Sequence, residues 1–141
     1  MVNGDPVSWQ SKRQSTVALS SVQAEYVALV EFTKEALWIK SLLSEMLVTV
    51  DGPLVAYEDN LPAISVAKHS SHHASMKHVD LRMHFLRELV EDGTLKIEWI
   101  DTTRQLADIL TKPLGPQIYE KFRDQLVHPQ YAALACYCYF N

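Results

Sequence analysis

Long apolar runs are absent from this sequence. None approaches the roughly 18 residues that a membrane-spanning helix needs, and no apolar segment of the secretory kind follows Met1. Only two cysteines occur, Cys136 and Cys138, and their C-x-C spacing suits neither an ordinary disulfide nor a zinc site. A positive net charge is absent too: the formal charge is −4, which leaves only a local basic face for binding polyanions. We therefore expect an intracellular protein, in the cytoplasm or the nucleus, without membrane contact.

The remaining composition is that of an ordinary globular protein. The 141 residues are 48% hydrophobic and 21% charged, which suits one domain with a core of modest size. We assign this domain to residues 1–127 and a tail without clear periodicity to 128–141.

Hydrophobic periodicity predicts alternating strands and helices. The predicted strands are 6–12, 54–57 and 94–100, and the predicted helices are 21–47, 60–68, 76–91, 102–112 and 115–127. The predicted N-caps include Ser20 or Ser21, Asn60, and Thr102 or Thr103. This order of elements favours a layered α/β sheet over a helix bundle.

A carboxylate lies on the apolar side of the long helix 21–47. At about 100° per residue, Glu25 falls near the middle of the apolar stripe of this helix. The other residues of the stripe are Ala28, Leu29, Phe32, Ala36, Ile39, Leu43 and Met46. An unpaired carboxylate that faces a core is costly, so Glu25 needs a cation, a metal ion or a water-filled cleft.

Two further carboxylates lie near the ends of predicted elements. Asp59 follows the strand 54–57, where ligands gather in open α/β sheets, and Asp80 lies in the first turns of helix 76–91. Together with Glu25 they could converge on Mg²⁺, which prefers oxygen ligands, and paired ions can act on a phosphodiester. The alternative is that Asp59 and Asp80 cap helices and that Glu25 pairs with a lysine.

Four segments carry a family resemblance. They are SKRQSTVALSSVQAEYVAL, YEDNLPAISVAK, KHVDLRMHFLRELVEDGTLKIEWI and QLADILTKPLG, in order over residues 4–126. Together they resemble the ribonuclease H domain that ends the polyprotein of copia-type LTR retrotransposons. The resemblance implies a five-stranded mixed sheet flanked by helices, and cleavage of the RNA strand of RNA–DNA hybrids with two divalent ions, Mg²⁺ or Mn²⁺. It also implies Glu25, Asp59 and Asp80 as catalytic metal ligands, and the reverse transcriptase portion of the polyprotein as a partner.

The sequence departs from this family at its N-terminal side. The family's first catalytic Asp has no counterpart, and Asp5, the only nearby acid, stands where the family has a turn. We therefore expect residues 1–127 to be a partial ribonuclease H-like domain that lacks the first two strands. The resemblance then predicts a gap between the strands 6–12 and 54–57 and impaired activity of the isolated chain. The alternatives are a non-catalytic nucleic-acid or protein-interaction module from the same element, and a degenerate gene without selected function.

Other polar residues near these acids are not counted as ligands. Glu58 precedes Asp59, and the alternation of a strand points it to the opposite face. The histidines of the segment 69–84 match no zinc pattern, and we interpret them as packing and capping residues. Proton transfer by His73 or His78 is the alternative.

Overall fold

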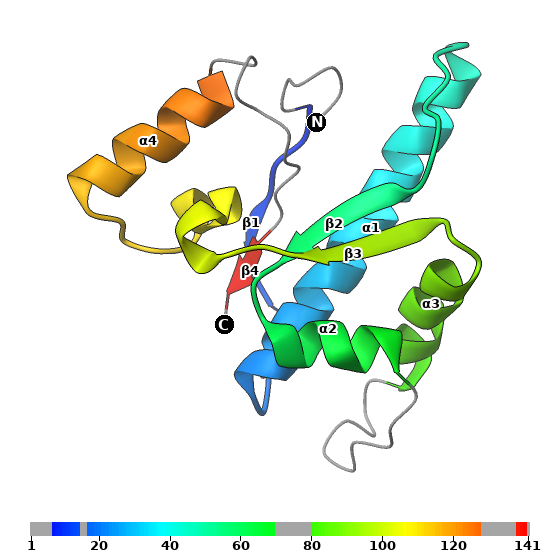
Figure 1. Cartoon of the computed structure of the whole chain (residues 1–141), viewed down its shortest axis with the longest axis horizontal. Coiled ribbons are helices and arrows are strands. Elements are labelled where there is room, and N and C mark those ends of the chain that lie inside the picture. The colour runs from blue at the N-terminus through cyan, green and yellow to red at the C-terminus, as the bar shows by residue number, and fades with distance from the viewer. Residues whose placement is uncertain (1–6, 15–16, 70–79, 128–137, 141) are drawn as a thin grey trace.

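The computed structural model describes residues 7–14, 17–69, 80–127 and 138–140. Within these residues the chain is an α/β protein with small parallel sheets and helices around them, as Figure 1 shows. The helices are α1 (Ser21–Glu45), α2 (Leu61–Lys68), α3 (Asp80–Glu91) and α4 (Pro116–Val127), and the strands are β1 (Ser11–Arg13), β2 (Leu54–Glu58), β3 (Leu95–Trp99) and β4 (Cys138–Phe140). Two short 3₁₀ helices, η2 (Thr102–Arg104) and η3 (Leu106–Leu110), follow β3. The predicted α/β class is therefore confirmed.

Helix α1 begins and ends close to the predicted bounds. Its N-cap is Ser20, whose Oγ accepts a hydrogen bond from the backbone N–H of Gln23 at 3.2 Å. The buried part of α1 ends much earlier than the apolar stripe predicted from the sequence. The reason is that the rest of the described chain covers mainly the first half of this helix. Phe32 and Thr33 are the last buried residues, and Met46, predicted to face the core, is 64% exposed.

The C-terminus of α1 carries a strained residue. The backbone N–H of Val48 donates to Leu43 O at 2.9 Å, and that of Leu47 donates to Ser44 O at 3.0 Å, which together form a Schellman motif. Leu47 adopts a φ of 61° there and is 92% exposed. Glycine adopts a left-handed backbone conformation readily. A leucine in this conformation raises the free energy of the folded state.

Leu47→Gly should therefore stabilise the protein. Relief of strain, less the extra freedom of glycine in the unfolded chain, should add about 0.5–1 kcal/mol to the free energy of unfolding. Thermal denaturation followed by circular dichroism measures this gain. Leu47→Ala keeps a β-carbon and removes nearly the same exposed surface, so it should give no gain. Equal stabilisation by both substitutions would contradict the strain argument.

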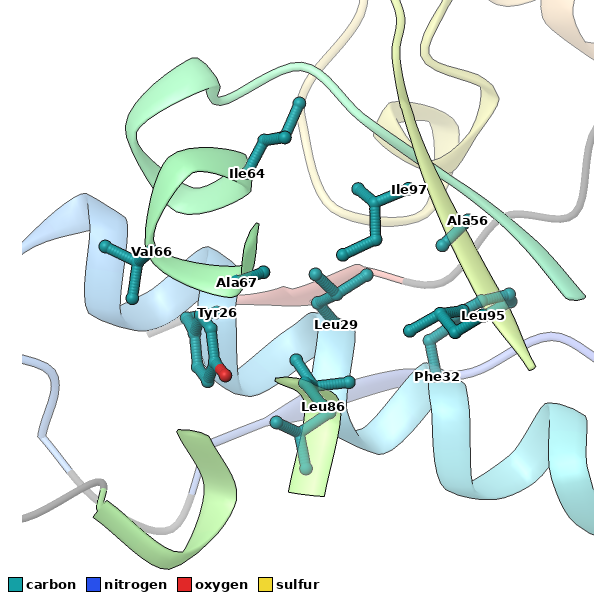
Figure 2. Packing of buried hydrophobic residues seen from close by; sticks show 11 residues of the cluster. Tyr26, Leu29, Phe32, Ala56, Ile64, Val66, Ala67, Leu86, Leu95 and Ile97 are labelled. Carbon is teal, nitrogen blue, oxygen red and sulfur yellow. The ribbon is translucent and has the colours of Figure 1, made fainter. Parts of the chain in front are cut away.

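The core lies between the β2–β3 pair and the first three helices. The strands are parallel, in a register that runs from Leu54 opposite Leu95 to Glu58 opposite Trp99. Figure 2 shows α1, α2 and α3 contributing side chains to one apolar cluster with these strands. Its members are Tyr26, Leu29, Val30, Phe32, Ala56, Ile64, Val66, Ala67, Leu86, Leu95 and Ile97. Because the pair is parallel, the carboxyl ends of β2 and β3 meet at one edge of the sheet.

The first strand differs from its prediction. Residues 7–10 have no regular structure, and β1 comprises only Ser11–Arg13. It pairs in parallel with β4, which lies within the tail that showed no periodicity, and Figure 1 shows the two strands side by side. The described strands thus form two separate parallel pairs, and β1 does not pair with β2. The five-stranded mixed sheet of the resemblance is not present in the described residues, and the division at residue 127 stays a prediction.

The segment after β3 is also not the single helix predicted at 102–112. Gln105 has a φ of −72° and a ψ of 96°, an extended conformation that separates η2 from η3. Asp101, rather than a threonine, caps η2: its Oδ1 accepts from the backbone N–H of Thr103 at 2.9 Å. This break gives the side chains of η2 and η3 separate orientations. Among the described helices, none has both the length and the apolar character to span a bilayer.

Candidate carboxylate site

Asp59 lies just beyond the carboxyl end of β2, as predicted. Its Oδ2 accepts a hydrogen bond from the hydroxyl of Thr102 at 2.8 Å. The helix-capping alternative is wrong for Asp59, because the N-cap of α2 is Asn60, whose side chain accepts from the backbone N–H of Ala63 at 3.1 Å. The Asp59 carboxylate therefore stays at the edge of the sheet.

Glu25 lies near the start of α1, and the charge of Asp59 acts on it. Its carboxyl group is partly buried, and burial is the main cause of its raised pKa. The negative charge of Asp59 raises the pKa further, the positive charge of Lys112 opposes this, and Asp108 adds a smaller increase. Charges from residues far apart in the sequence therefore act on the Glu25 carboxyl group.

Asp108 is the acid that sequence analysis missed. It lies in η3, is only 5% exposed, and holds the Nζ of Lys112 at 2.9 Å from both of its carboxylate oxygens. Burial raises the pKa of Asp108, the hydrogen bond and charge of Lys112 lower it, and Asp59 raises it. The signal was present in QLADILTKPLG, one of the segments that carry the resemblance.

The charges of Glu25 and Asp59 also act on Glu58, which sequence analysis did not count as a ligand. It is 5% exposed and lies on the same face of β2 as the buried Ala56. Its Oε1 accepts from the backbone N–H of Asn60 at 3.0 Å. Burial above all, with the charges of Glu25 and Asp59, raises the pKa of Glu58 to about 8 despite that hydrogen bond. We call Glu25, Glu58, Asp59 and Asp108 the carboxylate site.

Asp80, the third acid predicted as a ligand, is the first residue of α3. Its side chain lies outside the described part of the chain, as do Asp5, His73 and His78. The role assigned to Asp80 by the resemblance stays a prediction.

The chemistry of the carboxylate site fits a hard divalent cation. Carboxylate oxygens are the ligands that Mg²⁺ and Mn²⁺ prefer. After burial, the charge of Asp59 contributes to the raised pKa values of Glu25 and Asp108, and a positive charge would oppose that contribution. Among the described residues, however, no three His, Cys, Asp or Glu side chains lie close enough to form a ready metal centre. The site therefore has a suitable donor set, but its side chains must move to enclose an ion.

Comparison with known proteins relates this segment to mobile elements. The chain is 44% identical over 118 residues to the retrovirus-related Pol polyprotein from transposon TNT 1-94 of Nicotiana tabacum, which covers 84% of the chain and 9% of that protein. It is 40% identical over 117 residues to the corresponding polyprotein from transposon RE2 of Arabidopsis thaliana, covering 83% of the chain and 8% of the relative. Transposon RE1 of the same plant gives 38% identity over 121 residues, 86% of the chain and 8% of the relative.

Over most of its length, this chain is similar to a segment of retrotransposon Pol polyproteins. It spans less than a tenth of the length of these curated relatives. No family model matches the sequence, and no solved structure is significantly similar to it. The similarity thus relates the chain to a polyprotein region and leaves the activity of that region to be proposed.

Proposed function

We propose that the chain is part of a ribonuclease H-like domain that hydrolyses the RNA strand of RNA–DNA hybrids with divalent metal ions. The observation that carries this proposal is electrostatic: the negative charge of Asp59 helps to raise the pKa of both Glu25 and Asp108, two acids far from it in the sequence. The sequence resemblance supports it, and so does the similarity to Pol polyproteins over most of the chain.

In this proposal, three carboxylates would bind the metal ions, and neighbouring residues would position them. Glu25, Asp59 and Asp108 would hold Mg²⁺ or Mn²⁺ through their carboxylates. Bound divalent ions in such sites activate water and stabilise the charge that develops on a phosphodiester. Thr102 orients the Asp59 carboxylate by binding one of its oxygens, and Glu58 fixes the turn after β2 by accepting from Asn60. The 2′-hydroxyl groups of the hybrid would mark the RNA strand.

We expect the 141 residues alone to cleave RNA–DNA hybrids only weakly. The resemblance includes one more catalytic Asp that none of these residues matches, and the loss of a metal ligand costs several kcal/mol of transition-state stabilisation. The reverse transcriptase portion of a Pol polyprotein would be the natural partner of such a domain.

A second candidate is a non-catalytic module that binds nucleic acid or protein. It is favoured by the absence of a ready metal centre among the described side chains. Binding of a hybrid that needs no divalent ion and weakens with salt is the behaviour it predicts.

Cleavage of an end-labelled RNA–DNA hybrid tests the proposed function. We expect slow cleavage in Mg²⁺ or Mn²⁺, loss of cleavage in EDTA, and loss in Asp59→Asn. Asp51→Asn serves as the control, because Asp51 is exposed at the opposite end of β2 and should leave the rate unchanged. Salt-sensitive hybrid binding by a folded protein that cleaves in neither ion would favour the second candidate.

A further inference from the structure

The last turns of α1 carry large apolar side chains that are exposed. Trp38, Leu42 and Met46 follow one another at intervals of four residues, so they lie along one side of the helix. Their exposed fractions are 60%, 40% and 64%. Residues 44–53 are all exposed, and Figure 1 shows this end of α1 projecting beyond the strands. We call Trp38, Leu42 and Met46 the α1 end face, and a patch of this kind indicates an interaction site.

Two charges beside the α1 end face suit a second copy of the same helix. Lys34 and Glu45 are both exposed and lie about three helical turns apart. At about 100° per residue they fall on the same flank of the helix, next to Trp38. In a second copy that runs antiparallel, Lys34 of each copy lies opposite Glu45 of the other. Lys34 already binds Glu31 at 2.8 Å, but an ammonium group has three donors and can bind a second carboxylate.

The same antiparallel arrangement also brings the apolar residues together. The twofold axis that relates the two charge pairs passes between Ile39 and Lys40, midway along this part of the helix. Trp38 of one copy then lies close to Leu42 of the other, and the reverse contact forms by symmetry. A parallel copy in register would instead place like charges side by side.

We propose that the α1 end face binds a second copy of this chain, with the two α1 helices antiparallel. The proposal does not rest on the proposed function, because none of these residues belongs to the carboxylate site. A standard interface buries about 800 Å² per partner, whereas one fully buried aromatic side chain supplies about 150–250 Å². Three partly exposed side chains supply less than a standard interface, so we expect a weak dimer with a Kd of roughly 10–500 µM.

Sedimentation equilibrium between about 5 and 500 µM tests the apolar contact. The mean mass of wild type should rise from that of a monomer toward that of a dimer. Trp38→Gln should raise the Kd at least about tenfold, because it removes the largest side chain of the interface. Trp99→Gln is the matched control: Trp99 is 55% exposed but lies at the end of β3, so the Kd should stay unchanged. Circular dichroism confirms that each variant is folded.

A charge exchange tests the antiparallel arrangement. Lys34→Glu and Glu45→Lys should each raise the Kd about three- to tenfold, because each turns two attractive contacts of the dimer into repulsive ones. The combined variant exchanges the two charges and should return the Kd toward wild type. Both positions are exposed, so this test does not depend on how well the fold tolerates the loss of Trp38.

Each alternative result would overturn the proposal. A wild type that stays monomeric at every concentration would leave the α1 end face to another partner, such as a further part of a Pol polyprotein. Equal weakening by Trp38→Gln and Trp99→Gln would place the interface elsewhere on the chain. Single charge variants without effect, or a combined variant without recovery, would exclude the antiparallel pairing. Weakening by Trp38→Gln alone, together with recovery in the combined charge variant, supports it.

Discussion

Asp108→Asn should lower the cleavage of an RNA–DNA hybrid by roughly two to three orders of magnitude in Mg²⁺ or Mn²⁺, through loss of about 3–4 kcal/mol of transition-state stabilisation. Asp108 is buried, burial and the charge of Asp59 raise its pKa, and its own charge helps to raise the pKa of Glu25. An asparagine keeps the size of the side chain but removes the negative charge that would hold a cation. Single-turnover cleavage with saturating enzyme measures the effect without a contribution from substrate binding.

Two further variants provide the comparisons for Asp108→Asn. Asp101→Asn changes an exposed acid of the same loop whose capping role an asparagine can keep, so its cleavage rate should equal that of wild type. Asp80→Asn tests the residue that the sequence resemblance assigns to the site. If Asp80→Asn abolishes cleavage while Asp108→Asn does not, the geometric assignment of Asp108 is wrong. Circular dichroism of each variant excludes loss of fold as the cause.

Local signals explain the parts of the fold that could be predicted. The start of α1 depends on Ser20 and the start of α2 on Asn60, and each cap acts within three residues of itself. Strand β2 follows from an uninterrupted apolar run, and Asp59 was placed correctly because it directly follows that run. In these cases the information lies close to the residue that it positions.

Other features depend on contacts that no local pattern contains. Strand β1 pairs with β4, so Ser11 lies opposite Cys138 across almost the whole chain. The extended conformation of Gln105 breaks a segment whose periodicity suits one helix, and the 3₁₀ helix after it turns Asp108 inward. Alternation holds up to Glu58, which lies on the buried face of β2 with Ala56, but no local pattern contains the effect of the Glu25 and Asp59 charges on Glu58. Sequence analysis therefore singled out Glu25 and Asp59 but not Asp108 and Glu58, although Asp108 lies in a segment that carries the resemblance.

Glu58→Gln should change the pH dependence of stability more than any other single substitution in the carboxylate site. The pKa of Glu58 rises from its ordinary value of 4.5 to about 8, chiefly through burial. The folded state holds the proton of Glu58 more tightly than the unfolded state does. The contribution of protonated Glu58 to the free energy of unfolding is therefore fully present below pH 4.5. It is lost progressively as the pH rises toward about 8. Each step of one pH between these values costs about 1.4 kcal/mol, so wild type should lose roughly 3–5 kcal/mol across the range through Glu58 alone.

Glutamine should remove this loss, because it has no charge and its carbonyl can still accept from the N–H of Asn60. Urea denaturation at pH 5 and at pH 8 measures the effect as a free energy of unfolding. Wild type and Glu58→Gln should be similar at pH 5, and Glu58→Gln should be the more stable at pH 8. Glu88→Gln, at an exposed position of α3, should follow wild type at both values. Parallel curves for wild type and Glu58→Gln would mean that Glu58 ionises without cost, and that the negative charge of the carboxylate site is balanced more fully than burial and repulsion imply.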